Sequence, residues 1–171
     1  MLFRSHMQVP VVLSMEASAT GRGGYPIEVG YSHRHGDGWC TLVRPEPDWQ
    51  EWDDGLIHCH RIPRDTLQTA GRTVPEIAAF LNARLQGLTV YSESGSSGHF
   101  RLQQLFTAAG VEAMFRLADL QEIISPSQRQ IWQTTRIQIE KKLSLTRRRA
   151  SNQARIAQLT WLRTFDTVHA G

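Results

Sequence analysis

Two acidic residues, Glu16 and Glu93, stand where carboxylates could support chemistry. Residues 11–18 form an apolar run, typical of a buried strand, that ends in Ser14-Met15-Glu16. Glu93 directly follows a second apolar run at residues 88–92. Carboxylate oxygens are the ligands that hard divalent cations such as Mg2+ and Mn2+ prefer, so Glu16 and Glu93 are candidate ligands of one metal ion. The alternative is an ion pair in which a basic side chain takes the place of the metal.

Basic residues are concentrated late in the chain. Residues 1–122 contain ten Lys and Arg against 14 Asp and Glu, whereas residues 123–165 contain nine against Glu140 alone. A basic segment attached to a mildly acidic body indicates a surface that meets polyanions, here single-stranded DNA or RNA, and the alternative is a solvated helix face. The candidate nucleic-acid-binding residues are Lys141, Lys142, Arg147, Arg148, Arg149 and Arg155.

The histidines and cysteines form no recognised metal-binding pattern. His33 and His35 alternate along a predicted strand, and His60 is predicted to pack against neighbours rather than to ligate a metal. Cys40 and Cys59 lie in neither a Cys-x-x-Cys nor a zinc-type spacing. We therefore expect two reduced, mostly buried thiols and a cytoplasmic protein.

Length and composition predict one compact domain. The chain has 171 residues and is 40% hydrophobic, which is enough for a substantial core. We assign this domain to residues 9–167, and residues 1–8 to an N-terminal tail in which the residues before Met7 are a candidate expression remnant. No apolar stretch approaches the ~18 residues needed to cross a bilayer, and the start lacks the pattern of a signal peptide. We expect no membrane association.

The pattern of apolar residues and turns predicts a mixed α/β fold. Three strands come first, at residues 9–17, 25–35 and 39–45, with a hairpin turn at 36–38. Trp49 and Trp52, in the loop that follows, are predicted to cover the edge of the core. Later elements are a helix at 73–85 with Thr73 and Glu76 as a capping box, a strand at 88–92, a helix at 100–106, a short strand at 114–117 and helical sequence from Gln128, clearest at 147–165. Strands followed by alternating helices and strands imply a mixed sheet with helices on its faces.

Four segments carry a resemblance to a known family. The first joins Ser14-Met15-Glu16 to Tyr25-Pro26-Ile27-Glu28-Val29-Gly30. The others, in order, are residues 60–67, 91–106 and 148–155. Together they resemble the DEDDh 3'-5' exonuclease family, which is DnaQ-like and has an RNase H-like fold. The resemblance covers nearly the whole chain and implies an RNase H-like mixed sheet flanked by helices in a single domain.

The resemblance also assigns positions to a catalytic site. In that family four acids hold two divalent ions roughly 4 Å apart, and a histidine near the last helix acts as general base. The aligned positions here are Ser14, Glu16, Gly98 and Gln153 for the acids and Arg148 for the histidine. The resemblance therefore implies that one of the five functional groups is retained.

These departures predict loss of hydrolysis with retention of the fold. Arginine cannot act as a base because it does not deprotonate in proteins, and His99 is a candidate replacement. We expect Glu16 to pair with Arg148 or with a nearby hydroxyl. The loop at 92–98 offers backbone amides and hydroxyls for a phosphate, and the alternative is a flexible connection. The predicted function is a nucleic-acid-binding pseudoenzyme that needs no cofactor. The alternatives are a protein-interaction scaffold, including a homodimer, and a 3'-5' exonuclease with a rearranged Mg2+ or Mn2+ site.

Overall fold

A five-stranded mixed sheet forms the centre of the protein. The computed structural model describes residues 8–143 and 149–170. The strand order is β3-β2-β1-β4-β5, with β1 (Val11–Ala17), β2 (Pro26–Ser32), β3 (Gly38–Leu42), β4 (Thr89–Ser92) and β5 (Arg116–Asp119). The β1–β2 and β2–β3 pairs are antiparallel, whereas β1–β4 and β4–β5 are parallel. This arrangement confirms the predicted mixed sheet.

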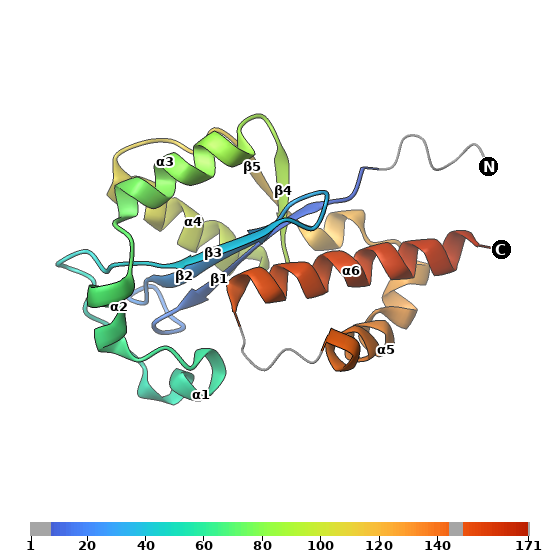
Figure 1. Ribbon diagram of the computed structural model, residues 1–171, viewed down its shortest axis with the longest axis horizontal. Coiled ribbons are helices and arrows are strands. Elements are labelled where there is room, and N and C mark those ends of the chain that lie inside the picture. The colour runs from blue at the N-terminus through green and yellow to red at the C-terminus, as the bar shows by residue number, and fades with distance from the viewer. Residues whose placement is uncertain (1–7, 144–148, 171) are drawn as a thin grey trace.

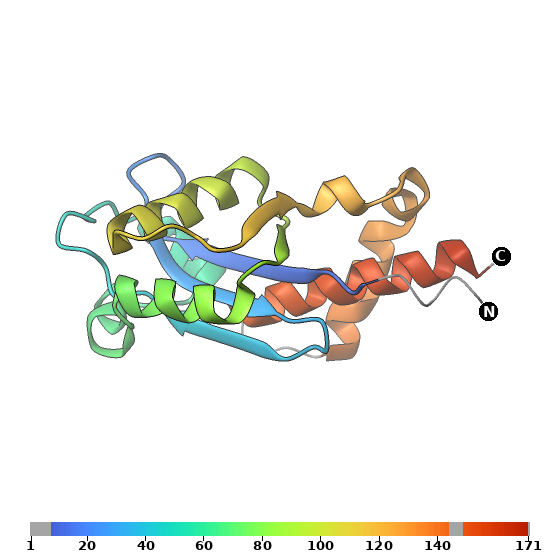
Figure 2. The ribbon, with the colours of Figure 1, turned by 90° about the horizontal axis from the view of Figure 1, so that it is seen from above.

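Helices cover both faces of this sheet (Figure 1). The helical elements are η1 (Asp54–Leu56), α1 (Ile57–His60), α2 (Arg64–Ala70), α3 (Val74–Leu85), α4 (Gly95–Ala109), η2 (Leu120–Ile123), α5 (Pro126–Leu143) and α6 (Ala150–His169). Helices α3 and α4 lie on one face, and α6 lies across the other with α5 beside it. Figure 2 looks down onto the side of α3 and α4. The sheet is therefore the middle of three layers.

The alternation of side chains along β1 assigns its residues to the two faces. Leu13 is buried in the core formed with α3 and α4. Val12 is buried in a second cluster with Ala154 and Trp161 of α6. Because successive side chains of a strand point to opposite faces, the even-numbered positions of β1 share the α6 side.

Several local predictions are confirmed. Thr73 caps α3, and the backbone N–H of Thr73 donates to Glu76 Oε2 at 3.0 Å, which completes the capping box. Gly36 has φ +83° in the β2–β3 hairpin, a left-handed conformation that favours glycine. Trp49 stacks on buried Tyr25 with ring centroids 5.6 Å apart, so it anchors the core edge as expected.

Other elements differ from the sequence-based prediction. Helix α4 begins at Gly95, five residues before the predicted start at Phe100. The last strand is Arg116–Asp119, two residues later than predicted. The final helical sequence forms two helices, and residues 144–148 between them lie outside the described residues, as do residues 1–7 and 171. Among the helices described, none combines the length and apolar character needed to cross a membrane.

Candidate nucleic-acid cleft

A small cavity collects polar side chains from four elements at the edge of the α6 face. Its volume is about 220 Å³. Ser14 and Glu16 reach it from β1, Glu93 from the end of β4, Arg136 from α5 and Gln153 from the first turns of α6. We call it the polar cavity. The structure thus brings together three of the residues that the resemblance assigned to the catalytic positions.

Arg136 fills the polar cavity with positive charge. Its Nη1 lies 2.6 Å from Glu93 Oε1, and its Nε lies 3.1 Å from Glu140 Oε1 one turn along α5. Its Nη2 donates to Gln153 Oε1 at 3.5 Å. Burial acts to lower the pKa of Arg136, but the hydrogen bonds and charges of the two glutamates outweigh it and raise that pKa above its ordinary value. Arg136 therefore stays cationic and links α5 to both β4 and α6.

A buried carboxylate outside the polar cavity, that of Glu28, docks the start of α6 onto the sheet. Glu28 lies directly opposite Glu16 in the β1–β2 register and is fully buried. Its Oε1 lies 2.8 Å from Arg149 Nε, and its Oε2 accepts the N–H of Ala150 at 3.3 Å. Burial raises the pKa of Glu28, although Arg149 and the Ala150 N–H act in the opposite direction. The predicted pair of Glu16 with Arg148 is not described, because Arg148 lies outside the described residues.

Gly98 does not lie in the polar cavity. It is the fourth residue of α4, and it lines an adjoining and larger cavity. A Cβ at this position would lie 2.8 Å from Ser92 Oγ and 3.3 Å from Ser94 Cβ. The prediction of a loop at 92–98 is wrong from Gly95 onward, because those residues form the first turn of α4. The phosphate contact through backbone amides stays a prediction, since the first N–H groups of a helix have no partner within the helix.

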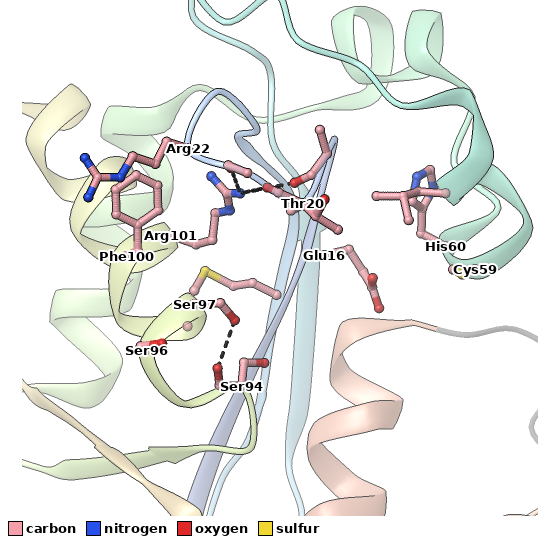
Figure 3. A pocket seen from close by; sticks show the side chains of 16 residues that line it. Glu16, Thr20, Arg22, Cys59, His60, Ser94, Ser96, Ser97, Phe100 and Arg101 are labelled. Atoms are coloured by element: carbon pink, nitrogen blue, oxygen red, sulfur yellow. Dashed lines mark hydrogen bonds between the residues drawn. The ribbon is translucent and has the colours of Figure 1, made fainter.

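The larger cavity continues from the polar cavity toward α1 and α4. It has a volume of about 670 Å³ and shares Met15, Glu16 and Ser94 with the polar cavity. Figure 3 shows Phe100 and Arg22 on one side, His60 and Cys59 on the other, and Glu16 between them. Phe100 is 40% exposed, so one large aromatic side chain is accessible beside the polar residues. We call this the large cavity.

Arg101 holds the loop that forms one wall of the large cavity. It is buried on α4, and its guanidinium donates to the carbonyl of Gly24, to that of Ala19 at 3.1 Å and to that of Gly21 at 2.7 Å. The loop at residues 18–25 also carries Arg22. The carbonyl contacts therefore fix the wall from which Arg22 extends (Figure 3).

The residues of the predicted basic cluster differ in their exposure. Lys141 and Lys142 are exposed at the end of α5. Arg149 is engaged with Glu28, and Arg155 donates to Gln158 Oε1 at 2.6 Å. Arg147 and Arg148 lie outside the described residues. Of the described members, Lys141 and Lys142 are exposed, Arg149 keeps 39% of its side chain exposed, and Arg155 is half-buried.

The cysteines and histidines are placed as follows. Cys59 is exposed and Cys40 half-buried, so the prediction of two mostly buried thiols is wrong. His60 is buried, and its Nδ1 accepts the N–H of Ile62 at 3.0 Å, which confirms its packing role. His99 faces the carbonyls of Gly95 and Leu117 rather than the polar cavity. Within the described ranges, no group of three or more His, Cys, Asp or Glu side chains is arranged to hold a metal ion.

The sequence-based reasoning did not single out Arg136, Phe100 or Arg101. Arg136 and Glu93 are 43 positions apart, so no local pattern joins them. A usable signal was the sequence of α5, in which Arg136 and Glu140 have the i, i+4 spacing of a helical ion pair. Phe100 falls at an exposed position of an amphipathic helix, which marks it as an aromatic side chain outside the core.

The arrangement of the sheet and its helices is the RNase H-like α/β fold. Solved structures of exonuclease I share it. The complex of E. coli exonuclease I with a 5cy-dA13 oligonucleotide gives a TM-score of 0.62 at 11% identity, over 94% of this chain and 42% of that chain. The E. coli complex with a dA16 oligonucleotide gives 0.64 at 11% identity, over 92% and 42%. The exonuclease I of Methylocaldum szegediense gives 0.62 at 11% identity, over 94% and 42%.

These likenesses show the fold alone, because the sequence identity is low. The chain spans less than half the length of the exonuclease I chains that it matches. No family model matches the chain, and no curated protein matches it in sequence.

Proposed function

We propose that this protein is an exonuclease-like domain that binds single-stranded nucleic acid without cleaving it. The binding site is the cleft that the adjoining polar and large cavities form together. The observation that carries the proposal is the composition of the polar cavity. Ser14 and Gln153 contribute neutral groups there, Glu16 and Glu93 contribute two negative charges, and Arg136 contributes a positive one. The charged side chains of this cavity thus sum to −1.

This set of groups does not fit a pair of divalent ions. Two ions about 4 Å apart bring four positive charges and need several carboxylate oxygens to offset their mutual repulsion. Of the two carboxylates in the polar cavity, Glu93 is already bound by Arg136 at 2.6 Å. The guanidinium would also repel any ion placed beside it. We therefore derive no hydrolytic step for this cleft.

Binding of a single strand is supported by the surroundings of the polar cavity. Phe100 is 40% exposed and offers an aromatic ring on which a base can stack, and Arg22 of the loop at residues 18–25 lies on the same side of the large cavity (Figure 3). Lys141 and Lys142 are exposed on α5, whose Arg136 reaches the cleft. Two of the three exonuclease I structures described above are complexes with oligonucleotides.

The binding test is fluorescence anisotropy with a labelled single-stranded oligonucleotide across a salt series. We expect the affinity to fall as salt rises, with a logarithmic slope of roughly −0.7 for each phosphate contact. Phe100→Ala should weaken binding about 5- to 150-fold, the equivalent of ~1–3 kcal/mol for one stacked base. Lys141→Gln with Lys142→Gln should reduce the salt slope.

A matched control is Arg116→Gln with Arg163→Gln, which removes the same charge from two exposed positions on β5 and near the end of α6. This control should leave the slope close to that of the wild type. Salt-independent or undetectable binding by the wild type would favour a protein-interaction scaffold instead.

The cleavage test uses the same oligonucleotide with Mg2+ or Mn2+, with and without a chelator. We expect intact oligonucleotide under every condition. Chelator-sensitive trimming of strand ends by wild-type protein would refute the proposal and support an exonuclease with a rearranged site.

A further inference from the structure

We infer that Arg136 is the resident cation of the cleft: its guanidinium occupies the oxygen atoms that would otherwise hold a divalent ion, and its removal exposes a cation site in this protein. The inference deepens the proposed function and rests on it. Arg136 directs Nη1, Nε and Nη2 to Glu93, Glu140 and Gln153 respectively.

Among the described residues, the side-chain partners of Arg136 contact it through oxygen atoms. Two of the three acceptors are carboxylates and the third is an amide oxygen, which are the ligand types that Mg2+ and Mn2+ prefer. A guanidinium and a metal ion cannot share them, because both are positive and both need the same lone pairs. Ser14 and Glu16 add further oxygen atoms in the same polar cavity.

The position of Arg136 makes this role structural as well as electrostatic. Its side chain is 17% exposed, and that of Glu93 is 30% exposed, so the pair is only partly screened by solvent. Through Glu93 it holds the end of β4, and through Gln153 it holds α6. One side chain therefore closes the cleft between three elements, as a bound ion would do.

Removal of the Arg136 guanidinium should raise the affinity of the cleft for a divalent ion. Without Arg136, the carboxylates of Glu93 and Glu140 lose the guanidinium that neutralises both of them. A divalent ion then takes over this neutralisation and gains oxygen ligands from β1, β4, α5 and α6. The wild-type cleft has little capacity for the same ion.

The experiment is a calorimetric titration of Mn2+ into wild-type protein, Arg136→Gln and Arg136→Lys. We expect Arg136→Gln to bind Mn2+ at least tenfold more tightly than the wild type, and Arg136→Lys to remain near the wild type because the charge is kept. Adding Glu93→Gln to Arg136→Gln should return the affinity to that of the wild type. Thermal unfolding with and without Mn2+ provides a second readout.

A matched control is Arg129→Gln, on the same helix, where the guanidinium donates to the carbonyl of Gln121 at 3.1 Å. It should leave Mn2+ binding unchanged. If Arg136→Gln does not fold in metal-free buffer, we expect added Mn2+ to restore its folded tryptophan fluorescence, because the ion takes over the contacts that the guanidinium makes in the wild type.

Two results would overturn the inference. One is a folded Arg136→Gln that binds Mn2+ no more tightly than the wild type, or an unfolded one that Mn2+ does not restore. This result leaves the proposed function intact if the wild type binds oligonucleotide without trimming it. The other is an equal gain in Arg136→Lys. Trimming by wild-type protein with Mn2+ would overturn both proposals, so the two failures are distinguishable.

Discussion

Replacing Arg101 by methionine tests how the wall of the large cavity is held. The side chain is buried, and its guanidinium binds the carbonyls of Ala19, Gly21 and Gly24. After the substitution Gly24 keeps the amide of Gln104, which donates to its carbonyl at 3.1 Å, and water can reach exposed Gly21. Ala19 is 4% exposed, so its carbonyl loses its donor without gaining water.

The magnitude follows from these three carbonyls. A buried acceptor left without a partner costs about 1–3 kcal/mol, and the contacts to Gly21 and Gly24 add a smaller loss. We expect Arg101→Met to lower the free energy of unfolding by about 2–3 kcal/mol, since methionine fills much of the same space. For a chain of this size that corresponds to a melting temperature about 4–12 °C lower.

The assay is urea unfolding followed by tryptophan fluorescence, with Arg116→Met as the control. Arg116 is exposed on β5 and lies 3.8 Å from Glu122, an arrangement worth at most about 1 kcal/mol. The reasoning is refuted if Arg101→Met costs no more than Arg116→Met. The same variant should bind oligonucleotide more weakly, because the loop that carries Arg22 loses its support.

Two further predictions concern the docking of α6. Burial raises the pKa of Glu28 in the folded protein, although Arg149 acts to lower it. The folded state therefore favours the protonated carboxyl group, so Glu28 stabilises the protein fully below the ordinary glutamate pKa of about 4.3. This stabilisation is lost as the pH rises through the raised pKa. The free energy of unfolding of the wild type, measured relative to Glu28→Gln by urea unfolding at several pH values, should therefore fall as the pH rises; a constant difference would contradict this. Gly30→Ala places a Cβ 2.5 Å from the backbone nitrogen of Ser151, so we expect a loss of about 1–3 kcal/mol. The control is Gly38→Ala, in which the nearest neighbour of the new Cβ would be 3.7 Å away. An equal drop in melting temperature for the two variants would argue against close packing at Gly30.

The sheet and much of its helical cover could be predicted because their signals are local. The apolar run of β1, the glycine turn of the β2–β3 hairpin and the capping box of Thr73 each lie within a few residues. The start of α4 was missed because Gly95-Ser96-Ser97-Gly98 has the composition of a flexible connection. Packing overrides that composition: Gly98 is buried beside Ser92, where a larger residue would collide.

The ion pairs of the cleft could not be predicted for a different reason. The pairing of Glu93 with Arg136 and of Glu28 with Arg149 depends on how α6 packs on the sheet and α5 on α6, and no spacing along the chain encodes it. The sequence did place Ser14, Glu16 and Gln153 at related positions through the family resemblance, and the structure gathers all three around one cavity. It did not indicate which cation would lie among them.

The docking of α6 on the opening strands has a consequence for synthesis. Glu28 and its partner Ala150 are 122 positions apart. At roughly 5–20 residues per second, a ribosome needs about 6–24 s to add that length of chain. Throughout that interval the side of β1 that carries Val12 has no covering helix, so we expect the nascent chain to be recognised by chaperones until its last helix emerges.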